Sequence, residues 1–230
     1  MHDETITSHA IEDYLKTIYL LQQDERRVTT SALARRLGVA AASVTNMVKR
    51  LAEMNLVRHA PYHGVELLPA GEKIALEVVR HHRLLELYLA EALGMPWDQV
   101  HAEADRLEHV ISEDLEERMA AVLGHPTMDP HGHPIPSRDL TVPERSQTAL
   151  TAAQPGDVVK IEWVSDLDPA HLRYLAALGL VPQATVEVLD VAPFNGPLRL
   201  RVGRSEVSLG RDLAAEVFLS RATAVSLRDT

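Results

Sequence analysis

Residues 30–54 read TSALARRLGVAAASVTNMVKRLAEM, and this stretch decides the fold of the first part of the chain. Thr29 or Thr30 can cap a short helix, and Gly38 then provides a tight turn. A second helix is expected over 41–54, because its apolar residues recur at helical spacing. The inward-facing residues are Val44, Met47, Val48 and Leu51. Helix, turn and helix together match the helix-turn-helix pattern.

The segments around this pair complete an expected DNA-binding domain. Apolar residues repeat at helical spacing over 9–24, and short strands at 56–58 and 65–67 flank residues 61–64 like a wing. The second helix begins with small and polar side chains that fit the major groove, and nearby basic side chains can neutralise phosphates. The residues expected to contact DNA are Arg26, Arg27, Ala41, Ala42, Ser43, Thr45, Asn46, Lys49, Arg50, Arg58 and His63. An ordinary three-helix core with a charged surface would show the same periodicity.

The composition limits the class of protein. The 230 residues are enough for two or three compact domains, and 46% of them are hydrophobic. The chain has no cysteine, which excludes disulfides and thiolate metal ligands. Its sequence begins with neither a basic nor an apolar targeting segment, and no apolar run reaches membrane-spanning length. A soluble cytoplasmic protein that does not bind membranes is therefore expected.

The net charge of −10 is unevenly distributed. Between Arg26 and Arg58 the only acidic residue is Glu53, so a basic patch coincides with the expected DNA-binding helices. Residues 71–140 instead hold 14 acidic and 6 basic residues, together with seven of the 12 histidines. Carboxylates and imidazoles in one region suit a cation site, although a solvated acidic helical surface would have the same composition.

Two long helices are expected in this acidic region, over about 71–93 and 98–123. Their candidate metal ligands lie three or four residues apart and so share a helix face. These candidates are His82 and Glu86 in the first helix, and His101, Asp105, Glu108 and His109 in the second. Imidazole nitrogens and carboxylate oxygens are suitable ligands for Mn²⁺, Fe²⁺, Co²⁺ and Zn²⁺. Spacing alone does not distinguish a metal sensor from a di-metal enzyme.

The last third of the chain is expected to form a small β-barrel-like domain. Residues 124–142 are rich in glycine, proline and histidine and are expected to form a loop or linker. Beyond it, runs of β-branched and apolar residues predict short strands around a helix at about 169–178. The expected strands are 158–164, 186–189, 198–202, 207–209 and 217–219.

Several of these stretches resemble one family. HRLLE at 82–86 and VHAEADRLEHV at 100–110 closely resemble the diphtheria toxin repressor family of iron- and manganese-dependent regulators. EDYLKTIY at 12–19 is similar to the first helix of that family, and GHPIP at 132–136 is similar to its loop after the dimerisation helices. The resemblance implies a mainly α fold with a small β part. It divides the chain into a winged helix-turn-helix domain at 1–72, a helical metal-binding and dimerisation domain at 73–142, and an SH3-like β-barrel at 147–228.

The resemblance also implies two metal sites. The primary site would use Asp13, Asp105, Glu108 and His109. The ancillary site would use His82, Glu86 and His101, together with Asp168 and His171 from the SH3-like domain. For Asp168, the cap of a helix starting at Pro169 is a close alternative to a ligand role. Because the primary set joins the DNA-binding domain to the dimerisation helices, a bound ion would hold two recognition helices about 34–36 Å apart.

The metal and the partners follow from the same resemblance. Iron-sensing members have sulfur ligands at the positions of Asp13 and Asp105, so the carboxylates here favour Mn²⁺ first and Fe²⁺ second. Zn²⁺, Co²⁺ and Cd²⁺ can substitute. Lys16 stands where one manganese branch has a glutamate, so the two-metal core of that branch should not form in the same way.

The expected function is a metal-activated regulator, in most members a repressor, that binds an operator in double-stranded DNA as a homodimer. A regulator that responds to a small organic ligand is the first alternative. A metal-dependent hydrolase is the second, and it is disfavoured because the chain lacks a His-Glu-x-x-His motif and a glycine-rich phosphate loop.

Overall fold

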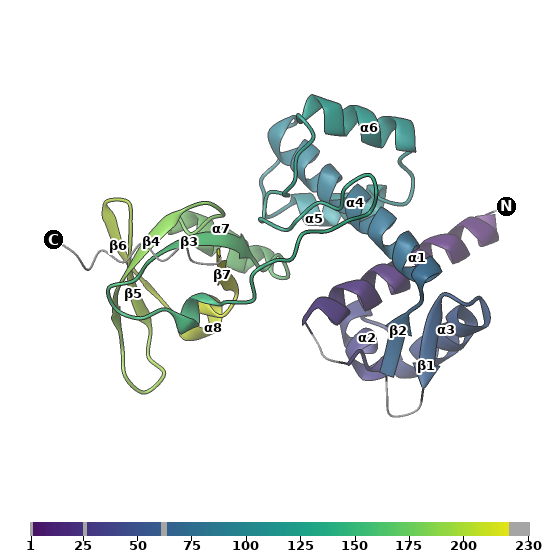
Figure 1. Ribbon diagram of the computed structural model, residues 1–230, viewed down its shortest axis with the longest axis horizontal. Helices are drawn as coiled ribbons and strands as arrows, with labels where there is room; N and C mark the ends of the chain where they lie inside the picture. Colours follow the sequence, from purple (N-terminus) through teal and green to yellow (C-terminus); the bar gives the residue numbers. More distant parts are fainter. Residues whose placement is uncertain (1, 25–26, 61–63, 221–230) are drawn as a thin grey trace. The chain divides into compact units, whose positions relative to one another are not determined.

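The structure is a computed structural model that describes residues 2–24, 27–60 and 64–220. It divides into two compact units, and Figure 1 labels their helices and strands. Unit 1 comprises Met1–His82, Asp105–Arg118 and Pro136–Thr141, and unit 2 comprises Arg83–Ala104, Met119–Ile135 and Val142–Thr230. Helices α4, α5 and α6 contribute residues to both units. Their bounds are Pro69–Glu91, Val100–Leu107 and Glu113–Val122.

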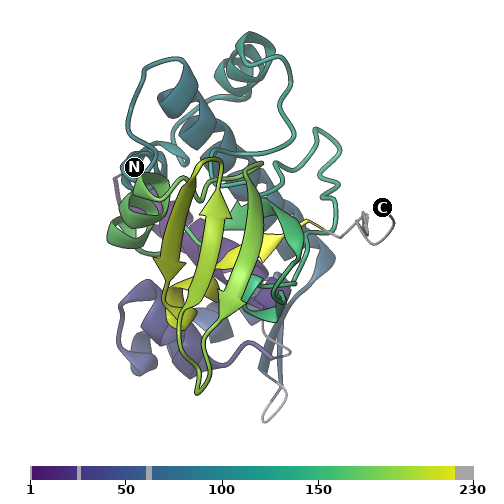
Figure 2. The same ribbon diagram turned by 90° about the vertical axis from the view of Figure 1, so that its left-hand side faces the viewer.

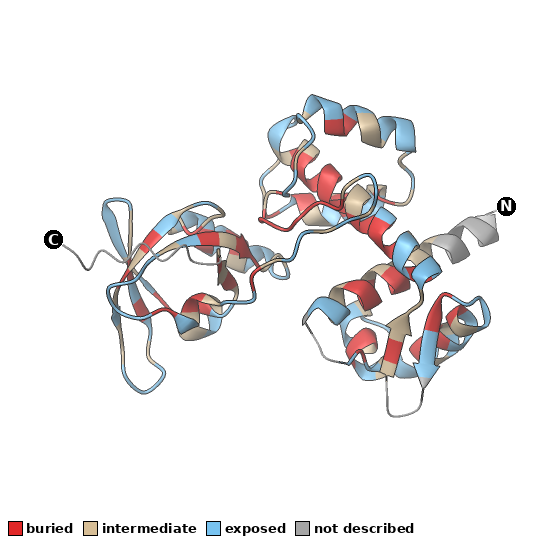
Figure 3. Ribbon diagram, in the orientation of Figure 1, coloured by how far each residue is buried: buried red, intermediate tan, exposed pale blue. Residues whose placement is uncertain are grey.

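Unit 1 contains a winged helix-turn-helix. Its N-terminal elements are α1 (His2–Asp24), α2 (Thr30–Leu37), α3 (Ala41–Glu53), β1 (Val57–Ala60) and β2 (Gly64–Leu67). Helix α1 packs against α2 and β2, and α3 packs against α2 and β1. The core between them consists of fully buried apolar side chains, and the ribbon of Figure 3 is red at buried residues. These include Leu15, Ile18, Leu33, Val44, Val48 and Leu51.

Local sequence explains the two short helices. The Thr29 hydroxyl accepts a hydrogen bond from the Ala32 backbone N–H and so caps α2. Gly38 ends α2 with a φ of +66°, a left-handed conformation that glycine adopts without steric cost. Ala40 stands at the N-cap of α3, and its methyl group cannot accept a hydrogen bond there. The first backbone N–H groups of α3 therefore remain available to an external acceptor.

Strands β1 and β2 form an antiparallel hairpin, the wing of the sequence prediction. The Val65 N–H also donates to the Val28 carbonyl at 2.9 Å, which ties the hairpin to the segment before α2. Across the hairpin, the Arg58 guanidinium pairs with the exposed carboxylate of Glu66. Arg26 and His63, two expected DNA contacts, lie outside the described residues.

The prediction of one long helix over 98–123 is wrong. Helix α5 ends at Leu107, a turn follows, and α6 begins only at Glu113. The Ser112 hydroxyl accepts a hydrogen bond from the Leu115 N–H at 3.3 Å, so Ser112 caps a new helix. Glu108 and His109 therefore lie in a turn and not on a helix face. None of the described helices is long and apolar enough to cross a bilayer.

Unit 2 contains a five-stranded antiparallel sheet in the order β6-β5-β4-β3-β7 (Figure 2). Its elements are η1 (Leu150–Ala152), β3 (Val158–Val164), α7 (Pro169–Ala177), β4 (Thr185–Val191), β5 (Leu198–Val202), β6 (Ser205–Leu209), α8 (Arg211–Ala214) and β7 (Val217–Leu219). The inward-facing residues of β3 to β7 and the apolar side of α7 form one buried core. The strands and the helix agree with the sequence prediction, whereas η1 and α8 were not expected.

The loop at 129–133 packs closely on the end of β3, also within unit 2. The Val164 N–H donates to the His131 carbonyl at 3.0 Å. Gly132 lies so close to β3 that an added Cβ atom would come within 2.1 Å of the Glu162 carbonyl oxygen. Its φ of +88° also belongs to the left-handed region. The short side chain and the permissive backbone of glycine thus allow this loop to reach the sheet.

We expect Gly132→Ala to destabilise unit 2 strongly. The left-handed backbone alone costs a non-glycine residue about 1–2 kcal/mol, and the overlap with the Glu162 carbonyl adds to that cost. Gly203→Ala is the matched control, because Gly203 has a φ of +59° but has nothing within 4 Å of the added Cβ. Urea unfolding should show a much larger decrease in the free energy of unfolding for Gly132→Ala than for Gly203→Ala. Equal decreases for the two variants would contradict the close packing of the loop.

Candidate metal centre

Helix α1 presents its polar side to the turn after α5, within unit 1. The apolar residues Leu15 and Ile18 are fully buried in the winged-helix core, which directs Asp13 away from that core. The Nε2 atom of His109 lies 2.9 Å from Oδ1 of Asp13 and 3.5 Å from Oε1 of Glu108. The ligand atoms of these three residues all lie within 4.8 Å of one another. This geometry could hold a divalent metal ion.

The second ring nitrogen of His109 has a separate partner. Its Nδ1 lies 2.7 Å from a carboxylate oxygen of Glu12, and its ring stacks on His9 at a centroid distance of 4.9 Å. Burial lowers the pKa of His109, but hydrogen bonds to Asp13 and Glu12 raise it more, to about 9. In metal sites, a carboxylate on one nitrogen commonly orients an imidazole whose other nitrogen binds the metal. Glu12 has this position relative to His109, and the sequence did not indicate it.

Glu108 faces a second group of side chains around Lys16. The Nζ atom of Lys16 lies 2.7 and 2.9 Å from the two carboxylate oxygens of Glu108 and 2.9 Å from Oδ1 of Asp105. It also lies 3.0 Å from Nδ1 of His82. The structure thus groups Asp105 with Lys16, His82 and Glu108, and not with Asp13 and His109.

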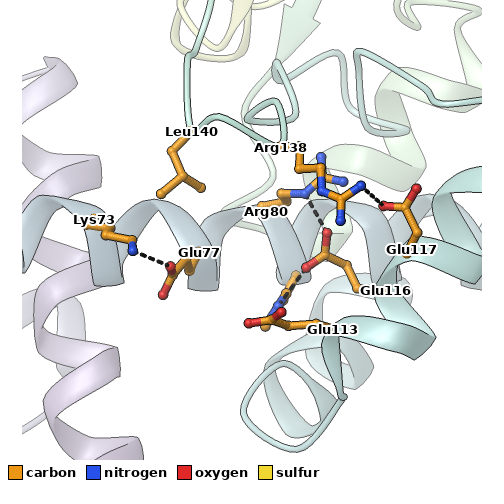
Figure 4. A pocket seen from close by; sticks show the side chains of 9 residues that line it. Lys73, Glu77, Arg80, Glu113, Glu116, Glu117, Arg138 and Leu140 are labelled. Atoms are coloured by element: carbon orange, nitrogen blue, oxygen red, sulfur yellow. Dashed lines mark hydrogen bonds and ion pairs between the residues drawn. The ribbon is translucent and has the colours of Figure 1, made fainter.

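A cavity of about 260 Å³ lies beside this region (Figure 4). On its wall, the Nε atom of Arg80 lies 2.5 Å from Glu116, and Nε2 of His81 lies 2.9 Å from the same carboxylate. The Nδ1 atom of His81 is 3.1 Å from the backbone carbonyl of Glu108. Burial lowers the pKa of His81, but the Glu116 carboxylate and the Glu108 carbonyl raise it on balance. Glu116 and His81 therefore hold the turn that carries Glu108.

Unit 2 has its own cluster of potential ligands. The ligand atoms of Glu86, His131 and Asp166 lie within 4.8 Å of one another. His101 adjoins this cluster, with Nδ1 at 3.0 Å from Glu86 and 3.7 Å from Asp166. A second group within 4.8 Å consists of Asp129, His131 and His133. The two groups share His131, whose side chain is fully buried.

His131 has the orientation of a metal ligand. Its Nε2 lies 2.9 Å from the Trp97 carbonyl oxygen, which can only accept, so Nε2 carries the hydrogen. Among the described residues, its buried Nδ1 has no hydrogen-bond partner, and Glu86 Oε2 is 3.6 Å away. Burial lowers the pKa of His131, but Glu86 and, less strongly, Asp129 and Asp166 raise it to about 10. The surroundings of Nδ1 therefore favour a positive charge.

Two residues of the expected ancillary site, Asp168 and His171, have other partners in unit 2. Asp168 caps α7 by accepting from the Ala170 N–H, which is the alternative that the sequence left open. His171 makes its closest contact with Glu216, at 2.9 Å. His82 belongs to unit 1, whereas Glu86 and His101 belong to unit 2. Within unit 2 the acid beside Glu86 and His101 is Asp166, two residues before the predicted Asp168.

The expected DNA-binding residues of α3 lie on one side of the helix. Ala41, Ala42, Ser43, Asn46 and Lys49 are exposed, as are Arg50, Arg27 and Arg58. Thr45 is half-buried, and its hydroxyl donates to the Ala41 carbonyl at 3.0 Å. The opposite side of α3 carries the fully buried Val44, Val48 and Leu51. An exposed polar face on the second helix of a helix-turn-helix is the arrangement that enters the major groove.

Three family models match successive parts of the chain. Residues 7–65 match the N-terminal DNA-binding domain of iron-dependent repressors. Residues 68–137 match the metal-binding and dimerisation domain of the same proteins, and residues 148–221 match the FeoA domain. The chain is also 34% identical over 219 residues to the iron-dependent repressor IdeR of Mycobacterium leprae, which covers 90% of this chain and 94% of that protein.

This chain belongs to the iron-dependent repressor family. A second relative of this repressor is the diphtheria toxin repressor of Corynebacterium diphtheriae, 29% identical over 213 residues, 88% of this chain and 93% of that protein. Among solved structures, a manganese-dependent transcriptional repressor in complex with manganese matches with a TM-score of 0.85 and 38% identity, covering 91% of this chain and 99% of the other. The manganese regulator SloR matches with a TM-score of 0.76 and 28% identity, and the match covers 92% of this chain and 98% of the SloR chain.

Membership in the family confirms the fold class and the regulatory, non-enzymatic nature expected from the sequence. The fold predicted for this repressor, helical N-terminal and dimerisation domains followed by an SH3-like sheet domain, is the one observed. The sequence had not indicated Glu12, Asp129, His131, His133 or Asp166 as site residues. The only signal for the two loop histidines was the histidine-rich stretch before Pro134, which had been interpreted as a linker.

Proposed function

We propose that this repressor is activated by Mn²⁺, with Fe²⁺ as the next candidate, and that it then binds an operator as a homodimer. The observation that carries the proposal is the group formed by Asp13, Glu108 and His109 in unit 1. Asp13 belongs to the first helix of the winged helix-turn-helix, whereas Glu108 and His109 belong to the turn after α5. An ion in this group would therefore join the DNA-binding elements to the helical region.

The ligand chemistry supports these two metals. The group offers two carboxylates and one imidazole, and the chain contains no cysteine. Oxygen-rich sets suit Mn²⁺, while thiolates select softer ions. Zn²⁺, Co²⁺ and Cd²⁺ can occupy the same ligands, since affinity rises along the first-row series. Structures of ScaR have been solved with Zn²⁺ and with Cd²⁺, which supports the proposal that several divalent ions can bind these ligands.

The residues of this group account for a metal-dependent change in DNA affinity. An ion held by Asp13, Glu108 and His109 would supply positive charge to the two carboxylates. Glu12 holds the His109 ring so that Nε2 faces Asp13. With α1 fixed to the turn, fewer orientations of the winged helix remain, and a larger fraction of dimers presents two α3 helices at the spacing of the operator.

The exposed face of α3 would carry the DNA contacts. Ser43 and Asn46 can bond base edges or phosphates, and Ala41 and Ala42 can approach thymine methyl groups. The uncapped N–H groups at the start of α3 can donate hydrogen bonds to a phosphate oxygen. Exposed apolar side chains for a dimer interface are Val110 and Leu115 in unit 1, and Leu93 and Val122 in unit 2. A repressor that binds its operator in this way would act in the cytoplasm.

We also infer a second metal site, in unit 2, from the distances around His131. It would use Glu86, His131 and Asp166, with His101, Asp129 and His133 close by. Acidic and imidazole groups this deeply buried need either internal pairing or a bound cation. This set keeps Glu86 and His101 of the expected ancillary site and replaces Asp168 and His171 by Asp166 and His131.

The proposed activation can be tested by titrating Mn²⁺, Fe²⁺ and Zn²⁺ against binding to a DNA fragment selected with the metal-loaded protein. We expect Mn²⁺ to raise affinity, EDTA to abolish the increase, and Asp13→Asn to require far more metal. Asp114→Asn is the control, because the Asp114 side chain is 78% exposed and pairs with the exposed Arg118 in the adjacent turn of α6. DNA binding that is unchanged by chelation would instead support regulation by a small organic ligand.

A further inference from the structure

Within unit 2, the corner between α4 and α5, at residues 96–98, packs against the SH3-like domain. The half-buried ring of Trp97 contacts the apolar core of the sheet. The Asp98 side chain is 7% exposed, and its carboxylate lies 2.9 Å from an Nη1 atom of Arg173 in α7. The corner thus offers one large apolar group and one charge, and both have their partners in the SH3-like domain.

The position of Asp98 in the chain suggests a different role, which the contacts do not support. Asp98 lies two residues before α5, where a carboxylate commonly caps a helix. Within the part of the chain that the structure describes, its carboxylate bonds to Arg173 and to no backbone N–H group. A buried carboxylate that loses its partner is strongly destabilised. Asp98 can therefore remain both buried and paired only while the SH3-like domain is docked.

The loop at 129–133 joins the corner to the sheet a second time. Nε2 of His131 donates to the Trp97 carbonyl at 2.9 Å. The backbone carbonyl of His131 accepts from the Val164 N–H, at the end of β3, at 3.0 Å. Each contact between the corner, the loop and the sheet joins two groups of the chain itself, so none of them requires an ion.

We propose that Trp97 and Asp98 latch the SH3-like domain to the helices of unit 2, and that the domain stays docked when no metal is bound. The indole is the main anchor, because aromatic side chains bury the largest apolar areas. The ion pair contributes less, since the Arg173 side chain is 60% exposed, but it directs α7 to the corner. The inference goes beyond the proposed function, because it concerns a contact that metal does not control.

The absence of cysteine makes the latch accessible to distance measurements. Glu91→Cys at the end of α4 and Arg204→Cys between β5 and β6 place one label on each side of the contact. Both positions are exposed and belong to unit 2. The spin-labelled full chain is mixed with excess unlabelled chain, so that a dimer carries one labelled copy. In EDTA, double electron–electron resonance should give a single narrow distance distribution.

Four variants in this labelled background test the latch. Trp97→Ala removes the apolar anchor and should add a broad component at longer distances. Arg173→Glu places a second negative charge beside Asp98 and should broaden the distribution to a smaller extent. Arg173→Lys keeps the positive charge and should leave the distribution narrow. The matched control is Arg199→Glu, which makes the same charge change at an exposed position of β5.

Two results would overturn the inference. One is a broad distribution for the wild-type sequence in EDTA that becomes narrow only when Zn²⁺ is added. The other is an unchanged narrow distribution in both Trp97→Ala and Arg173→Glu, with circular dichroism verifying that each variant is folded. Neither result affects the proposed function, which is tested separately by the loss of operator binding on chelation.

Discussion

Replacing Glu108 by glutamine should abolish metal activation while leaving the winged helix folded. Glu108 is 2% exposed and belongs to both ligand groups of unit 1, one with Asp13 and His109 and one with His82 and Asp105. Glutamine keeps the size of the side chain but removes the negative charge that a divalent ion requires. We expect Mn²⁺ affinity to fall by more than the ~10–100-fold that residues supporting a metal ligand typically contribute.

The readout for Glu108→Gln is operator affinity as a function of Mn²⁺ concentration, measured beside Asp105→Asn and Asp114→Asn. Asp105→Asn should lower the Mn²⁺ response less than Glu108→Gln does, because the structure places Asp105 beside Lys16. Asp114→Asn, at an exposed position of α6, should leave the Mn²⁺ response unchanged. A Glu108→Gln protein that still responds to Mn²⁺ at wild-type concentrations would exclude the proposed primary centre.

The second large effect is expected in unit 2, where His131→Gln should remove one metal ion per chain. Glutamine can still donate to the Trp97 carbonyl but lacks the nitrogen that faces Glu86. The chain has only two tryptophans, and both lie beside this cluster. Trp97 stacks on His131 at 5.5 Å between ring centroids, and Trp163 lies 5.2 Å from His133. Tryptophan fluorescence should therefore fall as Mn²⁺ binds, and His131→Gln should lose this response.

A purely structural role for His131 predicts a different outcome. A charged His131 paired with Glu86 would stabilise the metal-free protein, and its replacement would lower stability without changing metal stoichiometry. The control is His125→Gln, an exposed loop histidine in the same unit. Unchanged quenching and unchanged stoichiometry in a folded His131→Gln protein would rule out the second metal site.

The DNA-binding part of the fold could be predicted in detail because its signals are local. Thr29 caps α2, Gly38 ends it in a left-handed conformation, and Val44, Val48 and Leu51 are buried as their spacing indicated. Each of these features depends on residues within a few positions in the chain. The break at Ser112 could not be predicted because apolar residues continue at helical intervals across it, while a single hydroxyl begins the new helix.

The candidate sites could be predicted only in part, because they combine distant segments. Asp13 and His109 were expected together only from the resemblance to a known family. Glu12 was not distinguished from Asp13, since adjacent helical residues usually face different directions. Gly132 lets the 129–133 loop pack on the end of β3, and His131 and His133 of this loop lie near Asp166, which follows that strand. The periodicity of apolar residues along the sequence does not indicate which distant segments lie close together in the fold.

The ion pair between Arg58 and Glu66 in the wing affects how the protein searches for its operator. In the free protein the Arg58–Glu66 pair carries no net charge, although the Arg58 side chain is 69% exposed. Random stretches of DNA attract proteins through uncompensated lysines and arginines. An arginine that must first leave its carboxylate contributes little to such encounters, yet an exposed pair separates at small cost once a phosphate is close. We therefore expect weaker retention on unrelated sequences, so that the contacts proposed for α3 decide where the repressor stays.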